Sequence, residues 1–190
     1  MLLDIHLHTS RHSDCSRAEP VELIYRAMAR DLQGIVITEH HYLWPEDELA
    51  ALRTEAGVED DFLVLAGQEV STDIGHVLVF GADQSLEDKV SLKELRRNFP
   101  AAALVWAHPF RNGKAPSKDE LLSSLLDGIE IFNLNQTMSE NYRALTLWHR
   151  SLFTALSASD AHLVRDAGAV PSLFDHPVTC IGELAAEIRG

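Results

Sequence analysis

The amino-acid sequence predicts an α/β fold built on a parallel sheet, either open or closed into a barrel. Segments with strand-like and helix-like patterns alternate along the chain, which is typical of this class. The strand-like segments are mostly continuous apolar runs such as GIVIT and FLVLAG, as expected for strands that are covered on both faces. A chain of 190 residues suits one domain spanning residues 1–190, and about seven strands at this length favour a compact, short barrel.

The strands are predicted from short apolar runs that are bounded by turn-forming residues. They fall at residues 2–8, 34–39, 62–69, 76–80, 103–108, 128–133 and 154–159, with a weaker candidate near 178–181.

The helices are predicted from apolar residues at helical spacing and from capping signals. Pro20 stands at a plausible first helical position, and a serine precedes each of three further helical segments at Ser91, Ser117 and Ser139. SLKE and SKDE have the spacing of a capping box, and residues 182–190 form the last predicted helix.

Composition excludes several classes of protein. No apolar run approaches the roughly 20 residues of a membrane span, and the first residues lack the pattern of a secretory signal. Two cysteines are too few for a disulfide framework, so we expect a cytoplasmic protein without membrane partners. The net charge of −13 argues against an extended grip on nucleic acid, although bound metal ions would still admit a small anionic substrate.

Histidines and carboxylates gather where the predicted strands end. His6 and His8 end the first strand, His40 the second, Glu69 the third and His108 the fifth, while His76 opens the fourth and Asp160 and His162 follow the seventh. Since strand ends meet at one rim of a barrel, we expect these side chains to converge there. Clustered His, Asp and Glu at such a rim indicate a metal centre.

The same succession of motifs resembles the PHP (polymerase and histidinol phosphatase) family. The motifs are DIHLHT, SD at 13–14, TEH at 38–40, GQE at 67–69, GH at 75–76, AHP at 107–109 and SDAH at 159–162. The resemblance covers essentially the whole chain. It implies a distorted seven-stranded (β/α) barrel with a trinuclear metal site, most often one that hydrolyses phosphoesters.

Carried onto this sequence, the resemblance implies three metal positions. His6, His8, Glu69 and Asp160 would hold one ion, and Glu69 would bridge to a second ion that is also held by His76 and His108. Asp14, His40 and His162 would hold a third. Glu39 is the middle residue of TEH, where the family more often has the aspartate of TDH. It would support the ligands without binding metal.

Mixed imidazole and carboxylate ligands suit zinc, manganese or iron, alone or mixed, better than calcium or magnesium. Such ions lower the pKa of a water molecule toward neutrality, so a metal-activated hydroxide would attack phosphorus without a Ser or Cys nucleophile. Glu69 and Asp160 would serve this step as ligands. Arg17 and Arg111, which follow ligand motifs, would grip phosphoryl oxygens, with Arg165 and Lys114 as weaker candidates.

The favoured function is therefore a metal-dependent phosphoric ester hydrolase that acts on a small phosphomonoester or nucleotide. Alternatives are an end-directed nuclease or phosphodiesterase on short DNA or RNA, and a non-catalytic module that a metal stabilises. An amidohydrolase is a rival enzyme class, but those barrels are longer and use a bridging lysine. The sequence leaves the natural substrate, the metal and the oligomeric state open.

Overall fold

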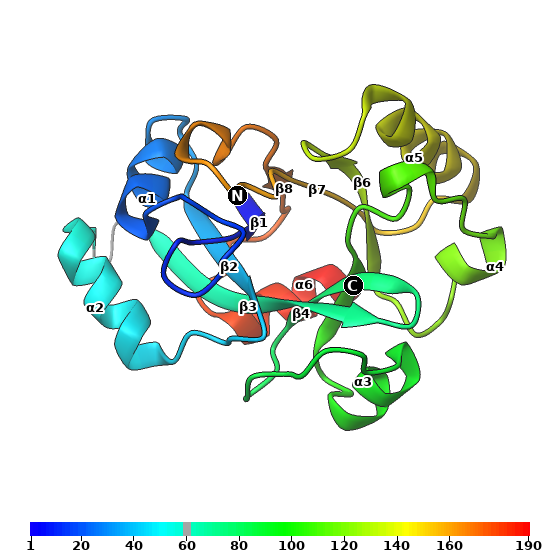
Figure 1. The fold of residues 1–190 in the computed structure, drawn as a ribbon, viewed down its shortest axis with the longest axis horizontal. Helices are drawn as coiled ribbons and strands as arrows, with labels where there is room; N and C mark the ends of the chain where they lie inside the picture. The colour runs from blue at the N-terminus through cyan, green and yellow to red at the C-terminus, as the bar shows by residue number, and fades with distance from the viewer. Residues whose placement is uncertain (59–61) are drawn as a thin grey trace.

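A computed structural model describes residues 1–58 and 62–190 of the chain. Within these residues, eight strands form one sheet in the order β7-β6-β5-β4-β3-β2-β1-β8. Their bounds are β1 Leu2–Leu7, β2 Gly34–His40, β3 Leu63–Thr72, β4 Gly75–Phe80, β5 Ala103–Trp106, β6 Gly128–Asn133, β7 Ala155–Ala158 and β8 Ser172–Leu173. Figure 1 shows this sheet curved around a central axis, with most helices on its outside.

The two ends of the sheet almost meet, which makes it a distorted barrel, as the sequence predicts. The backbone amide of His8 donates to the carbonyl of Ala161 at 3.0 Å, and Leu7 forms an isolated parallel bridge with the same residue. On the far side, the amide of Ser157 donates to Oγ of Ser172 at 2.9 Å. First and last parts of the chain are thereby held side by side.

The sheet is mixed, so the expectation of an all-parallel sheet is wrong. β4 runs antiparallel to both β3 and β5, and β8 runs antiparallel to β1. The cause is the short connection from Thr72 to Gly75, since a turn of this length can only join antiparallel strands. Gly75 has φ +126°, a conformation that residues with a side chain rarely adopt. This hairpin brings the start of β4 to the same end of the barrel as the end of β3.

The described part of the chain contains six α-helices, which pack around the sheet and across one end of it. They are α1 Pro20–Met28, α2 Glu46–Ala56, α3 Leu92–Asn98, α4 Lys118–Leu121, α5 Met138–Ser151 and α6 Ile181–Arg189. The capping boxes at Ser91 and Ser117 are confirmed, because each serine side chain accepts from the amide three residues on. The predicted cap at Ser139 is wrong: Thr137 caps α5. The weak strand near 178–181 is also wrong, because Ile181 begins α6 and the last strand lies at β8 instead.

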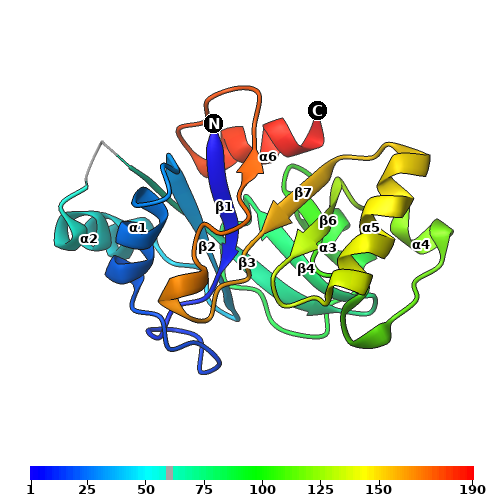
Figure 2. The same cartoon turned by 90° about the horizontal axis from the view of Figure 1, so that it is seen from above.

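The barrel interior is apolar at one end and polar at the other. The apolar end is closed by helix α6, which lies there together with both chain termini (Figure 2). Leu184 of this helix packs with Leu3, Ile5, Phe80 and Val105. The pairing of β1 with β2 shifts register between Asp4 and Leu7. In a regular strand, side chains at odd and even positions point to opposite faces. The irregularity changes this alternation, so that Leu3 and Ile5 point into the apolar part of the barrel interior and His6 and His8 point into its polar part.

No helix in the described part of the chain has the length and apolar character needed to cross a membrane.

Candidate metal centre

Four buried donors meet at the open end of the barrel. His6, His8, Glu69 and Asp160 each present one ligand atom, and all of these atoms lie within 4.8 Å of one another. Nε2 of His6 lies 3.2 Å from Nε2 of His8, and Oε2 of Glu69 lies 3.3 and 3.2 Å from these two nitrogens. Oδ1 of Asp160 is 3.4 Å from the His6 nitrogen. The structure thus brings together the four residues that were grouped around the first ion.

The chemistry of this group fits a divalent cation. Nδ1 of His6 donates to Oε1 of Glu130 at 2.8 Å, which leaves the Nε2 lone pair pointing at His8. Oδ1 of Asp160 is buried and has no hydrogen-bond partner. Converging lone pairs and an unsatisfied buried carboxylate oxygen are costly by themselves, and a bound cation removes both costs.

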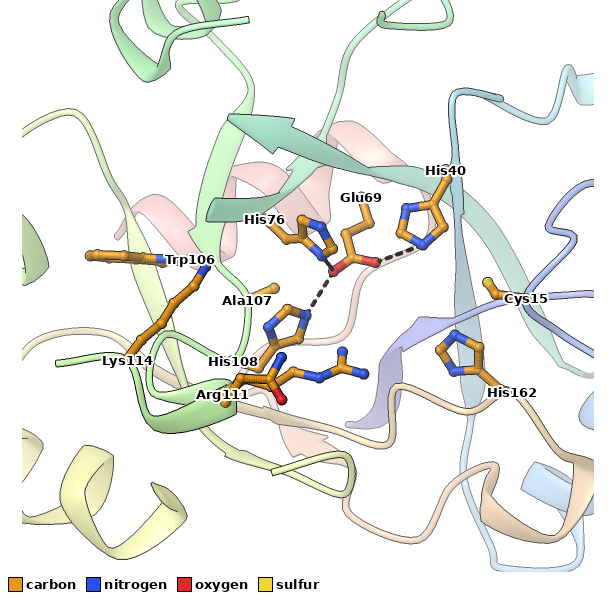
Figure 3. A pocket seen from close by; sticks show the side chains of 11 residues that line it. Cys15, His40, Glu69, His76, Trp106, Ala107, His108, Arg111, Lys114 and His162 are labelled. Atoms are coloured by element: carbon orange, nitrogen blue, oxygen red, sulfur yellow. Dashed lines mark hydrogen bonds and ion pairs between the residues drawn. The ribbon is translucent and has the colours of Figure 1, made fainter. Parts of the chain in front are cut away.

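A second donor group shares one residue with the first. Oε1 of Glu69 lies 2.7 Å from Nδ1 of His76 and 2.8 Å from Nε2 of His108, as the dashed lines of Figure 3 show. The other Glu69 oxygen faces the first group. One carboxylate therefore stands between two sets of donors, which is the arrangement of a bridging ligand.

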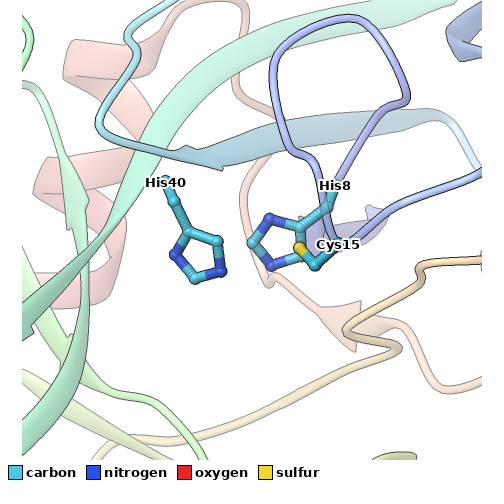
Figure 4. Close-up of side chains that lie close together, drawn as sticks. All are labelled: His8, Cys15 and His40. Carbon is cyan, nitrogen blue, oxygen red and sulfur yellow. The ribbon is translucent and has the colours of Figure 1, made fainter.

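The third expected group differs from its expected composition. His40 and His162 flank His8, each with ring centroids 4.6 Å away, and both line the pocket above it. Asp14, however, is exposed and belongs to no donor group among the described residues. Cys15 instead forms a group with His8 and His40 (Figure 4).

Electrostatics keep the carboxylates of the centre ionised. Burial alone would raise the pKa of Glu69, but the His6, His108 and His76 imidazoles hold this pKa well below its usual range. Asp160 behaves in the same way: burial opposes ionisation, and His6 and His8 lower its pKa. Burial disfavours a proton on His6, yet Asp160, Glu130 and Glu69 raise the His6 pKa well above the ordinary value. The surplus of negative charge around His6 attracts a cation.

Buried acidic residues hold the ligands from behind. Oε2 of Glu130 accepts a hydrogen bond from the amide of His108 at 2.8 Å, while its Oε1 accepts from His6. Glu130 therefore supports one ligand in each of the two donor groups. Glu39 accepts from Thr9, Ser13 and Trp44, a supporting position that agrees with its expected role. Asp4 accepts from the Ser159 amide and hydroxyl at 3.0 and 2.5 Å, next to Asp160.

Sequence reasoning missed Glu130. Its only signal was that it is the one charged residue in the strand GIEIFN, which was interpreted as apolar core. An acidic residue in the middle of a buried strand needs polar partners, and this requirement could have marked it.

The backbone is strained at two of the donors. His108 has φ +32° and Asp160 has φ +50°, where residues with a side chain are uncommon. Such conformations persist where the surroundings enforce them and are concentrated at functional sites. His108 lies just beyond the end of β5 and Asp160 just beyond the end of β7, and both side chains belong to the donor groups.

A cavity of about 360 Å³ opens over the centre and is lined by His40, His76, His108 and His162 on the donor side. Arg111, Asn112 and Lys114 also line it, and Figure 3 shows Arg111 and Lys114 on the side of His108. Nη1 of Arg111 lies 3.4 Å from Oδ2 of Asp160 (Figure 3 shows its side chain extending toward the donors). A group bound in this cavity would contact both imidazoles and the cationic side chains of Arg111 and Lys114.

The other predicted arginines lie elsewhere. Arg17 is exposed and does not line the cavity; its backbone amide donates to the carbonyl of His162 at 3.0 Å. Arg165 is 77% exposed and pairs with Asp166 at 3.6 Å. Lys114, the weaker candidate, does line the cavity.

Comparisons with known proteins give the fold of the chain. No protein-family model and no curated protein matches the sequence. A protein assigned as a metal-dependent phosphoesterase from Bifidobacterium adolescentis is 17% identical, with a TM-score of 0.66 over 98% of this chain and 96% of that one. A two-domain protein from Bacteroides vulgatus that contains a predicted PHP-like metal-dependent phosphoesterase is 22% identical, with a TM-score of 0.64 over 86% of this chain and 52% of that one.

An amidohydrolase from Chromobacterium violaceum, whose structure holds sulfate and no metal, has a TM-score of 0.67 at 17% identity, covering 97% of this chain and 96% of that one. At these identities the likeness concerns the fold. The chain therefore has the fold of the PHP-like metal-dependent phosphoesterases, and its polar barrel end has donor groups suited to divalent metal ions.

Proposed function

We propose that the protein is a metal-dependent phosphoesterase that hydrolyses a small phosphomonoester or nucleotide. The observation that carries this proposal is one cavity in which two donor groups, joined by Glu69, lie beside the cationic side chains of Arg111 and Lys114. Two of the structural neighbours are assigned or predicted as phosphoesterases, and the amidohydrolase neighbour binds sulfate, a tetrahedral anion like phosphate.

His6, His8, Glu69, His76, His108 and Asp160 would hold the ions of the first two groups. Bound there, divalent ions lower the pKa of water and offset negative charge on phosphoryl oxygens.

The chain's own residues bind and orient the phosphoryl group. The Arg111 guanidinium reaches the rim of the donor cluster, and its planar fork matches two phosphate oxygens. Lys114 lines the same cavity, and its Nζ lies close to Gly75, where an added Cβ atom would be 3.3 Å away. These cations give a local attraction for an anion in a protein whose net charge is −13.

The dimensions favour a small substrate. The cavity volume of about 360 Å³ falls at the lower end of the roughly 300–1,000 Å³ typical of small-molecule sites. A second hollow of about 430 Å³ shares Trp106 and Lys114 with the lining of the main cavity, and it offers room for the remainder of the ester. Short DNA or RNA ends, as the alternative, would have to enter the same cavity end-on.

The test is a substrate panel on protein of measured metal content. It includes p-nitrophenyl phosphate, nucleotides, histidinol phosphate, oligonucleotides and an N-acyl amino acid as an amidohydrolase probe. We expect hydrolysis of phosphomonoesters above the other classes. Faster cleavage of the amide, or no activity with the metal positions filled, would overturn the proposal.

The Glu69→Gln variant separates catalysis from a merely structural metal. Because Glu69 serves both donor groups, its replacement should reduce kcat/KM by more than the roughly 10- to 100-fold typical of outer supporting residues. Far-ultraviolet circular dichroism should show the fold retained. Unchanged activity would favour the non-catalytic module.

A further inference from the structure

The third donor group of the structure consists of His8, Cys15 and His40. It shares His8 with the first group and contains a cysteine where the resemblance implies an aspartate. Cys15, His8 and His40 each place one ligand atom within 4.8 Å of the other two. His8 and His40 are stacked with ring planes 23° apart, and the Cys15 sulfur faces them from the loop that follows β1 (Figure 4).

The conformation of this loop decides which side chain faces the donors. Ser13 is buried and donates to Oε2 of Glu39 at 2.5 Å, while Ser16 is buried and donates to the carbonyl of His8 at 2.7 Å. The amide of Ser16 also donates to the carbonyl of Ser13 at 2.9 Å, which closes a turn around the two residues between them. With both serines fixed inward, Asp14 and Cys15 are both exposed, but of these two residues Cys15 lines the cavity, together with His40 and His162.

From this geometry we propose that Cys15 is a thiolate ligand of the third metal position, and that Asp14 is not a ligand. Thiolate is a soft donor, which prefers zinc or iron over manganese and magnesium. The third position would therefore select a softer ion than the carboxylate-rich groups around Glu69. The inference rests on the proposed metal-dependent function, because it concerns the metal preference of the same centre.

Cobalt(II) substitution tests the ligand directly, because a cobalt–thiolate bond gives a strong charge-transfer band in the near ultraviolet that imidazole and carboxylate ligands do not give. The full-length protein is freed of metal, reloaded with cobalt without oxygen, and its cobalt content is measured. We expect the band in the wild-type protein and its loss in Cys15→Ser, with about one cobalt ion fewer per chain.

Two variants serve as matched controls. Cys180→Ser removes the other cysteine, which is exposed at the start of α6 and lines a different hollow, and it should leave the band unchanged. Asp14→Asn should likewise leave both the band and the cobalt content unchanged. Cys15 is itself exposed, so its replacement by serine should not disturb the core, and circular dichroism checks this.

The assignment is overturned if the wild-type protein shows no band, if the band survives in Cys15→Ser, or if Asp14→Asn removes about one cobalt ion. A further variant, Cys15→Asp, should restore the ion while shifting the preference in competition from zinc toward manganese. The readout is independent of turnover: a band without phosphoester hydrolysis would reject the proposed function alone, and hydrolysis without a band would reject the Cys15 ligand alone.

Discussion

Nδ1 of His6 and Oε1 of Glu130 lie 2.8 Å apart in the barrel interior, and both side chains are fully buried. This contact fixes the tautomer of His6 and turns its Nε2 toward the other donors. Outer hydrogen bonds of this kind orient metal-binding histidines and increase their basicity.

Replacing Glu130 by Gln should therefore weaken metal binding without removing any proposed ligand. We expect the affinity for the first ion to fall by about 10- to 100-fold, because the amide supplies no negative charge to the imidazole. Chelator competition on the purified protein measures this change. Glu22→Gln, an exposed site in the first turn of α1, is the control and should bind metal as the wild type does. Equal affinity in the two variants would contradict the supporting role of Glu130.

Arg111 and Arg17 provide a matched pair for the phosphate-binding wall. Loss of a hydrogen bond to a charged group costs about 1.5–3 kcal/mol, so Arg111→Ala should lower kcat/KM for a phosphomonoester by roughly 10- to 100-fold. Arg17→Ala should leave it unchanged, because Arg17 is exposed and does not line the cavity. Steady-state kinetics measures kcat/KM for both variants. A larger decrease in Arg17→Ala than in Arg111→Ala would show that Arg17, and not Arg111, binds the phosphoryl group.

Removing metal should destabilise the fold, because Glu69, Asp160 and Glu130 are buried close together and lose the cation that offsets their charge. An ion present at 100 times its Kd stabilises the protein by about 2.7 kcal/mol. Thermal unfolding with and without EDTA measures the shift, and added zinc or manganese should reverse it. The shift should be smaller in Glu69→Gln. An unfolding temperature that does not respond to EDTA would contradict a structural contribution of the ions.

Gly67 permits the close contact of β3 with β4 beside the centre. A Cβ atom at this position would lie 2.8 Å from Cδ1 of Phe80 and 3.0 Å from the carbonyl oxygen of Val79. Gly67→Ala should lower the free energy of unfolding by roughly 1–3 kcal/mol, since one of these groups must shift in a packed core. Gly182→Ala in α6, where the nearest atom is 3.9 Å away, should not lower it. Urea denaturation compares the two variants.

The sequence by itself determined the strands β1 to β7, most of the helices and the positions of nearly all the donors. Each of these depends on local pattern: apolar runs form buried strands, capping boxes begin helices, and polar residues at strand ends such as His108 reach one rim. Convergence of His6, His8, Glu69 and Asp160 followed from that rule, although they are separated by up to 154 residues in the chain.

Only the tertiary structure decided the supporting role of Glu130 and which of Asp14 and Cys15 lines the cavity. Each depends on contacts between segments far apart in the sequence. Glu130 has a partner in His6, 124 residues away, and Ser13 sets the turn by binding Glu39, 26 residues away. Local sequence patterns carry no information about which distant group will satisfy a buried polar side chain, and that pairing selects which of two adjacent residues faces the cavity.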